Sequence, residues 1–340
     1  MVPQNVLPVL GRAIRVMGLV LFGLLFCTNR STAQSPLDQV HVLPHVGRDF
    51  STPAIELMDF GVSKPIKVKV NLVLVPVTVT DPMDRIVTNL DRGDFEIIDG
   101  KAPQEIRHFS KQDAPISVGI ILDCSGSMKT KMDRAREAVT AFLKTGNPVD
   151  EFFLITFADQ PEEVANFGDS IEDMQSRLVT TIPKGRTALL DAVYLGFNKM
   201  RHAKYQKKAL LIISDGGDNH SRYNEGEIKS VAREADVIIY AVGIFDHSFS
   251  TLEEALGPTL LTSLTTMTGG RAYGVDNPNN LPEIARRIGV ELRDQYVLGY
   301  HPTQDRRDGR FHKIKVKMRL AKNAPRLRVY AKSGYYAPSE

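Results

Sequence analysis

The sequence predicts an α/β protein: a doubly wound, mostly parallel sheet flanked by helices, joined to a second unit that is all β. Two observations predict this fold class. In the middle of the chain, short and nearly continuous apolar runs alternate with segments whose apolar residues recur every three or four positions. That is the pattern of buried parallel strands separated by amphipathic helices. On both sides of this region the apolar residues recur at every second position, which is typical of strands with one buried face.

The middle region contains the elements of a βαβ fold. The expected parallel strands are Ile116–Leu122, Phe152–Phe157, Ala209–Ser214 and Val237–Val242. The expected helices are Met132–Leu143, Ile171–Val179, Ala188–Arg201, Glu225–Ala235 and Leu281–Arg293. Because strands and helices alternate throughout, we expect residues 115–293 to form one doubly wound domain.

Residues 61–112 are expected to form a small β unit. The run Ile66–Thr80 alternates and is rich in β-branched residues, which predicts a strand. Phe95–Ile98, followed by Asp99-Gly100, predicts a hairpin whose return strand is Glu105–Phe109. A unit of roughly 50 residues is marginal on its own.

Residues 294–338 return to the β pattern. The expected strands are Gln295–Tyr300, Phe311–Met318 and Leu327–Tyr336. Neither flank is large enough to cover its own sheet edges. We therefore expect these strands to pack with residues 61–112 as one sandwich.

The first 33 residues have the order of segments found in secretory signal peptides. Arg12 and Arg15 precede the twelve-residue apolar run Val16–Cys27, and small residues occupy the −3 and −1 positions of a cleavage site after Ala33. The run is shorter than the roughly 20 residues that span a bilayer, so we favour a cleaved signal over a retained anchor. We expect an exported protein, either periplasmic or secreted to the cell surface, with residues 34–60 as a flexible lead-in.

Charge and cysteine content exclude some classes of protein. The chain has 43 Lys and Arg against 40 Asp and Glu. The excess comes from three arginines in the first 33 residues, which hold no acidic residue, so the rest of the chain is neutral. A neutral body lacks the basic surface that nucleic acids require. Signal cleavage would leave Cys124 alone and exclude an intramolecular disulfide.

Oxygen-bearing side chains follow the predicted strands at positions where doubly wound sheets bind ligands. A D-x-S-x-S pattern ends the first parallel strand, a threonine precedes a helix, and an aspartate follows the strand Ala209–Ser214. These five candidate metal ligands are Asp123, Ser125, Ser127, Thr187 and Asp215. We expect Gly126 to let the backbone bend so that the two serine hydroxyls converge.

Carboxylates and hydroxyls are the ligands that a small hard cation such as Mg²⁺ prefers. Two carboxylates balance a dication only formally and the hydroxyls add no charge, so the ion keeps an electrophilic open position. An Asp or Glu of a partner protein can fill that position. Metal-assisted hydrolysis would need a general base beside the bound water, and only His220 lies near the motifs.

The blocks ILDCSGSM, GRTALLDAV and LLIISDGGDN resemble the complete metal-ion-dependent adhesion site of von Willebrand factor type A domains. The resemblance covers residues 115–293. It is closest to exported bacterial proteins of the acidobacterial type, which hold one such domain between β flanks. It implies that Ser125, Ser127 and one aspartate contact the ion directly, that the other aspartate acts through water, and that Thr187 joins when ligand is bound.

The resemblance also implies that the last helix, Leu281–Arg293, can shift when ligand binds. Because this helix leads into the C-terminal strands, coupling between the metal site and the β flank is a hypothesis.

We therefore expect an exported, non-enzymatic adhesion or interaction module that binds a protein carboxylate through Mg²⁺ or Mn²⁺, with Ca²⁺ as a further alternative. Two other interpretations stay open: a scaffold whose β flanks bind the partner, and a metal-dependent hydrolase. No nucleic acid and no membrane span after cleavage are expected. The partner and the oligomeric state are not determined by the sequence.

Several motifs have simpler interpretations. Asp123 and Asp215 could instead cap helices, and Arg92-Gly93-Asp94 spells an adhesion tripeptide within a turn-rich link, where we favour turn chemistry. Further residues are assigned to turns, packing or unligated side chains: His41, His45, Asp81, Asp84, Cys124, Asp305, Asp308, Tyr335 and Tyr336.

Overall fold

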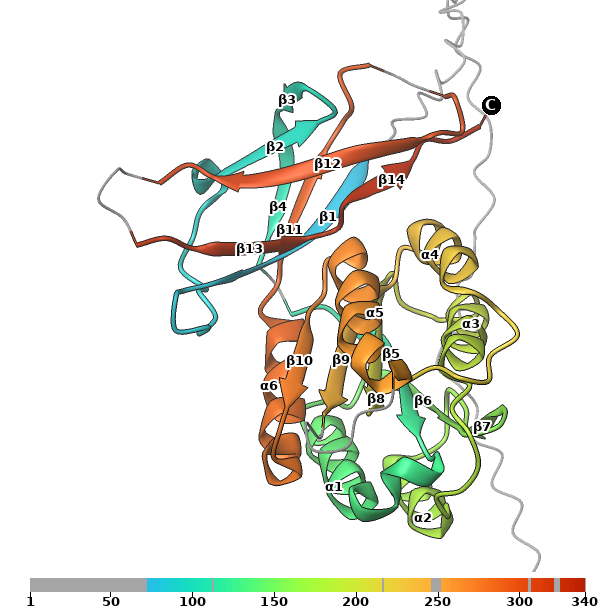
Figure 1. Ribbon diagram of the computed structural model, residues 1–340. Coiled ribbons are helices and arrows are strands. Elements are labelled where there is room, and N and C mark those ends of the chain that lie inside the picture. Colours follow the sequence, from blue (N-terminus) through green and yellow to red (C-terminus); the bar gives the residue numbers. More distant parts are fainter. Residues whose placement is uncertain are drawn as a thin grey trace, which may run out of the picture. The chain divides into compact units, whose positions relative to one another are not determined.

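The computed structural model describes residues 72–339 apart from 112, 216, 246–251, 305–306 and 321–324. The elements labelled in Figure 1 all belong to the unit Ile66–Glu340. The predicted signal and lead-in, both early histidines, Asp305 and residues 66–71 of the first predicted strand lie outside the described residues.

A six-stranded sheet, in the order β10-β9-β8-β5-β6-β7, forms the centre of the α/β part. Its strands are β5 (Ile116–Asp123), β6 (Glu151–Phe157), β7 (Pro161–Ala165), β8 (Lys207–Ser214), β9 (Ile238–Ile244) and β10 (Ala272–Val275). All neighbours are parallel except β7, which runs antiparallel to β6. The parallel strands follow the doubly wound 2-1-3-4-5 order, so the winding reverses between β5 and β8. The predicted fold class is confirmed.

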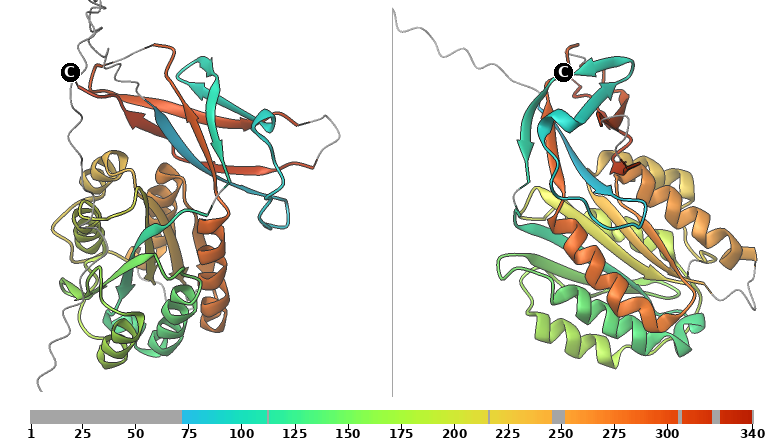
Figure 2. Two further views of the ribbon diagram at one scale, coloured as in Figure 1. Left: turned by 180° about the vertical axis from the view of Figure 1, so that it is seen from behind. Right: turned by 90° about the vertical axis from the view of Figure 1, so that its left-hand side faces the viewer.

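Helices cover both faces of this sheet because its strands are apolar on both sides. The helices are α1 (Met132–Leu143), α2 (Ile171–Thr180), α3 (Leu189–Met200), α4 (Glu225–Glu234), α5 (Leu252–Thr268) and α6 (Leu281–Arg293). One core joins Ile120 and Leu122 of β5 to α1, α2 and α6, and a second joins Ile121 to α3, α4 and α5. The right-hand view of Figure 2 shows α1, α2 and α6 on one side of the sheet and α5 on the other.

The remaining strands form two four-stranded sheets, β13-β1-β11-β4 and β14-β12-β2-β3. Their bounds are β1 (Val73–Thr80), β2 (Phe95–Asp99), β3 (Ala102–Gln104), β4 (Ile106–Ser110), β11 (Tyr296–Tyr300), β12 (Phe311–Met318), β13 (Arg328–Ala331) and β14 (Gly334–Tyr336). Each sheet mixes strands from both flanks of the α/β part: β1 pairs with β11 and β13, and β2 pairs with β12. Val75, Ile97 and Leu298 belong to one apolar cluster that includes residues of both sheets.

Two strand predictions were wrong. The return strand of the hairpin is β3, which pairs with β2, whereas β4 crosses to the other sheet and pairs with β11. The predicted strand Leu327–Tyr336 is two strands, because Ser333 interrupts it by donating its backbone N–H to Met267 of α5 (3.1 Å). β13 and β14 therefore belong to different sheets.

Helix α5 was absent from the sequence prediction. Its interior holds Pro258, a residue that normally ends helices, and its threonines have low helix propensity. Tertiary contacts override both signals, since Leu261 and Leu264 are buried against β9.

A buried charged network joins α6 to the β sheets. Glu291 of α6 is fully buried and accepts hydrogen bonds from Arg271 Nη1 (2.9 Å) and from the Tyr273 hydroxyl (2.6 Å). Arg271 also pairs with Asp84, in the turn after β1, and Asp84 pairs with Arg287 of α6 (2.6 Å). Asp84 is therefore both the predicted turn former and an ion-pair partner.

The central strands run away from the two β sheets, so their carboxyl ends lie at the far end of the α/β part (Figures 1 and 2). Among the described residues, no helix is both long and apolar enough to span a membrane.

Candidate metal centre

Strands β5 and β8 end side by side where the winding of the sheet reverses. Leu122 of β5 pairs with Ile213 of β8, so Asp123 and Asp215 leave the sheet at the same edge. Doubly wound sheets bind ligands in the crevice outside this point.

Asp123 is fully buried at the end of β5. Its Oδ1 accepts a hydrogen bond from the Ser125 backbone N–H (2.8 Å), and its Oδ2 accepts one from the Ser214 hydroxyl (2.6 Å). These bonds fix the direction of the carboxylate. Burial, together with the charge of the nearby Asp215, raises the pKa of Asp123 to about 6.

The two serine hydroxyls of the D-x-S-x-S pattern converge, as the sequence predicts. Ser125 Oγ and Ser127 Oγ lie 3.0 Å apart. The predicted role of Gly126 was wrong, because this glycine does not adopt a positive φ and a Cβ there would make only an ordinary contact of 3.4 Å. The position that requires glycine is Gly185, which has a φ of +81° and where a Cβ would clash with Asp159 Oδ2.

Thr187 lies in a loop that is hydrogen-bonded to both other loops of the site. Gly126 donates to the Gly185 carbonyl (3.0 Å), and the Thr187 carbonyl accepts from Asn219, four residues after Asp215 (3.0 Å). The Thr187 side chain is buried, and its hydroxyl has no hydrogen-bond partner among the described residues. It is therefore available to a ligand.

Asp215 is the second buried carboxylate, with 4% exposure. Its Oδ2 accepts a hydrogen bond from Lys131 Nζ at 3.1 Å. The sequence motifs did not point to a role for Lys131, Ser214 or Gly185. A lysine eight positions after Asp123 was visible in the sequence, but its contact with Asp215 depends on how α1 is placed.

The oxygen atoms of this edge fit a small hard cation. All five candidate ligands offer carboxylate or hydroxyl oxygen, which suits Mg²⁺ or Mn²⁺ and not a soft metal. Within the described parts of the chain, no group of three or more His, Cys, Asp or Glu residues could hold a metal ion, so the hydroxyls are needed to complete a ligand set. Lys131 is the one cation of the described residues in contact with either carboxylate, which leaves the pair one positive charge short.

The simpler interpretation of the two aspartates is not supported. Helix α1 begins after Lys131, helix α4 is capped by Asn224, and the described helices have no cap from Asp123 or Asp215. In contrast, Asp94 of the Arg-Gly-Asp tripeptide accepts from the backbone of Asp91 (2.8 Å) within a 3-10 turn. The tripeptide therefore follows turn chemistry, as expected.

Cys124 also follows its simpler interpretation. Its side chain is buried, and burial raises the pKa of its thiol to about 12. A thiol with so high a pKa is neutral and unreactive at physiological pH.

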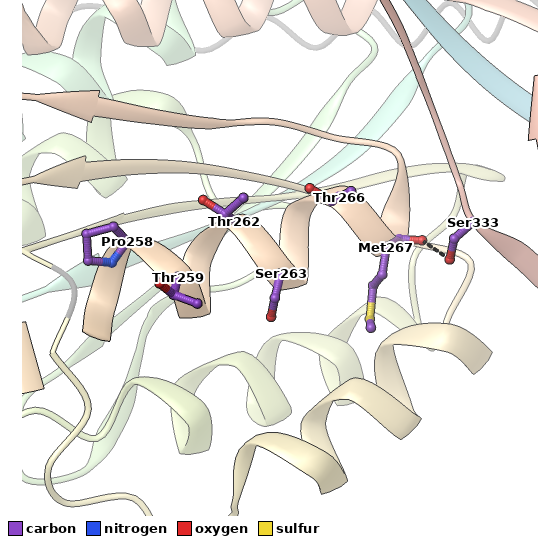
Figure 3. Close-up of a pocket in the computed structure, with 7 residues that line it drawn as sticks. All are labelled: Pro258, Thr259, Thr262, Ser263, Thr266, Met267 and Ser333. Carbon is purple, nitrogen blue, oxygen red and sulfur yellow. Dashed lines mark hydrogen bonds between the residues drawn. The ribbon is translucent and has the colours of Figure 1, made fainter. Parts of the chain in front are cut away.

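Two hollows elsewhere on the described surface contain none of the five residues. One, of about 580 Å³, runs along α5 to Ser333 and is lined by short hydroxyl side chains, Pro258 and Met267 (Figure 3). It has no titratable group in its lining. The other, of about 560 Å³, lies between the amino ends of β8 and β9 and the β sheets.

Residues 118–217, which include all five candidate ligands, match the model of the von Willebrand factor type A domain. This part of the chain is similar to a von Willebrand factor type A domain. A curated relative from Borreliella burgdorferi is 22% identical over 189 residues, which are 48% of this chain and 55% of that protein. The match therefore spans about half the length of the relative.

Solved structures of low identity also resemble this chain. A von Willebrand factor type A protein from Catenulispora acidiphila is 16% identical, with a TM-score of 0.47 over 74% of this chain and 64% of that one. BatB from Bacteroides thetaiotaomicron is 17% identical, with a TM-score of 0.43 over 52% of this chain and 98% of that one. The PilB minor pilin from Streptococcus sanguinis is 14% identical, with a TM-score of 0.45 over 54% and 63%.

Proposed function

We propose that this protein is an exported interaction module whose von Willebrand factor type A domain binds a protein partner through a divalent cation. Domains of this family generally serve protein–protein interaction or adhesion. The observation that supports a metal-dependent mode here is the pair of buried carboxylates, Asp123 and Asp215, beside three hydroxyls and a single ammonium. Mg²⁺ or Mn²⁺ supplies the missing positive charge, and Ca²⁺ is the further alternative.

The residues of the site would each contribute differently to holding the ion. Asp123 is oriented by its two hydrogen bonds, and the serine hydroxyls lie close enough to share one ligand. The unpartnered Thr187 hydroxyl adds a further oxygen. When bound, the ion offers an electrophilic position that an Asp or Glu carboxylate of the partner fills.

Binding is favoured over hydrolysis because the carboxylates next to the site are already occupied. Asp218 accepts from the Leu190 N–H (2.9 Å) and the Ser221 hydroxyl (2.5 Å), and Asp159 accepts from Arg186. A general base needs a free acceptor beside the reacting water.

Exposed apolar side chains shortly before Thr187 in the chain support a protein as the ligand. Val179 and Ile182 are 69% and 75% exposed, and they lie at the end of α2 and in the segment that leads to Thr187. Large apolar side chains left in water beside a binding site are typical of protein contact surfaces.

Isothermal calorimetry with Mg²⁺ and Mn²⁺ on the chain from Gln34 tests the metal site. We expect saturable binding in the wild type and loss of binding in Asp123→Ala, because the substitution removes a carboxylate that is aimed at the ion. The matched control is Asp133→Ala, because Asp133 is an aspartate of α1 whose side chain is 91% exposed. The Mg²⁺ affinity of this variant should stay within about twofold of wild type, since exposed charges are screened by solvent.

Absence of binding in the wild type, or equal binding in wild type and Asp123→Ala, contradicts the proposed metal site. The β flanks would then be the next place to search for a partner surface.

A further inference from the structure

Lys131 has an unusual place in the fold. It immediately precedes α1, and its backbone carbonyl accepts the first-turn hydrogen bond from Ala135 (3.0 Å). The amino end of a helix disfavours positive charge because the backbone N–H dipoles point there. A lysine at this position needs a compensating anion, and Asp215 supplies it at 3.1 Å.

The pair is largely removed from water. The side chains of Lys131 and Asp215 are 16% and 4% exposed. The other basic side chains of this segment are engaged elsewhere or lie in solvent: Arg136 binds the carbonyls of Leu178 and Thr181, and Lys129 is exposed. Lys131 is therefore the cation that neutralises Asp215.

We propose that Lys131 competes with the metal ion for Asp215 and must be displaced when the ion binds. This inference rests on the proposed metal-binding function and names a residue that sets the affinity of the same site. One ammonium and two carboxylates leave a net charge of −1. A dication that takes the place of the ammonium balances the two carboxylates, so the loaded site is formally neutral.

Competition of this kind has a measurable cost in metal affinity. A dication that enters must break the Lys131–Asp215 ion pair and approach a like charge, and both effects are strong where water is largely excluded. Removing the ammonium should therefore tighten metal binding, although the change moves no candidate ligand.

The test is Mg²⁺ calorimetry on Lys131→Gln, with Lys129→Gln as the matched control. Both substitutions remove one positive charge from the same segment, so they change the net charge of the protein equally. We expect Lys131→Gln to bind Mg²⁺ about tenfold more tightly than wild type. Lys129→Gln should stay within about twofold, because an exposed charge is screened.

Thermal unfolding gives a second readout that does not depend on the calorimeter. Without metal, Lys131→Gln should melt below wild type because Asp215 is left buried without its cation. With saturating Mg²⁺ the two melting temperatures should converge, since the ion takes over that role. Lys131→Arg, which keeps the charge, should resemble wild type in both measurements.

The outcomes separate this inference from the proposed function. If wild type binds no Mg²⁺, the proposed function fails. If wild type binds Mg²⁺ while Lys131→Gln binds it equally or more weakly, the function stands and competition by Lys131 is wrong. An equal gain in affinity from Lys129→Gln would also overturn the proposal, because it would reduce the effect to net charge.

Discussion

Asp123 has hydrogen-bond donors on both oxygens but no cation in contact among the described residues. Hydrogen bonds from Ser125 and Ser214 favour the charged form, yet burial and the charge of Asp215 outweigh them and raise the pKa of the carboxyl to about 6. The metal-free site is thus electrostatically unfavourable at neutral pH, which is a useful property in a site built to bind a cation.

This shift predicts how the metal-free protein responds to pH. A carboxyl whose pKa is raised on folding stabilises the fold fully below its unfolded value near 3.8, and that contribution is lost as the pH rises through about 6. Urea unfolding in EDTA should therefore show wild type losing about 2 kcal/mol between pH 4 and pH 8, relative to Asp123→Asn. Parallel pH profiles for the two proteins would show that Asp123 does not titrate in this range.

At the scale of single residues, much of the candidate site could be predicted from the sequence. Asp123, Ser125 and Asp215 could be placed because each follows a buried apolar run, and parallel strands bring such positions to one edge. Lys131 could not, because its contact depends on the packing of α1 against the sheet. Gly185 could not either, since its positive φ follows from how the Thr187 loop docks on Gly126.

At the scale of elements, α6 has two separate sets of contacts. Leu281, Ile288 and Leu292 pack into the core beneath α1, while Glu291 enters the charged network with Arg271. The proposed shift of α6 on ligand binding stays a hypothesis. Such a shift would cost free energy, because moving the helix would separate the buried opposite charges of Glu291 and Arg271.

The network predicts a large difference between two glutamates of this helix. Glu291→Gln should lower the free energy of unfolding by about 3 kcal/mol, because Arg271 loses a buried charged partner. Glu283→Gln removes an exposed partner of Arg286 and should lower the free energy of unfolding by less than about 0.5 kcal/mol. Urea denaturation of both variants measures the difference, and similar small costs would show that the buried pair does not stabilise the fold.

Elements with strong periodicity were predicted closely, and the others were not. Helices α1 and α6 have the predicted bounds, because their apolar residues recur on one face. Helix α5 was missed because it contains Pro258 and many threonines. The division of Leu327–Tyr336 could not be predicted, since Ser333 is held by a carbonyl of α5, distant in sequence.

At the scale of the molecule, the α/β part is an insertion between strands that pair with one another. Ser110, which ends β4, is the register partner of Val297 in β11, although the whole α/β part lies between them in sequence. The chain therefore leaves the β sheets after Ser110 and returns to them before Val297 at two points that are close in space. The strands of residues 61–112 depend on strands that follow the insertion.

This arrangement predicts opposite behaviour for two shortened chains. Residues 61–112 alone should be unfolded by circular dichroism, because β1 loses both of its neighbours and Val75, Val77 and Ile97 lose their cover. The same residues joined to 294–340 by a short turn should unfold cooperatively on heating. A folded fragment 61–112 would contradict the shared core.

Strand β5 joins the two ends of this architecture mechanically. The β sheets lie at its amino end and the candidate metal centre at its carboxyl end, and it is paired with β6 over Ser117–Asp123 and with β8 over Ile116–Leu122. A partner pulling on the metal centre would stretch the molecule along β5 itself. The strand could slide only if both ladders sheared at once, so the load would be shared by many hydrogen bonds instead of peeling them one after another. A strand whose residues are all buried is thus also the one aligned with the tension that an adhesive contact would apply.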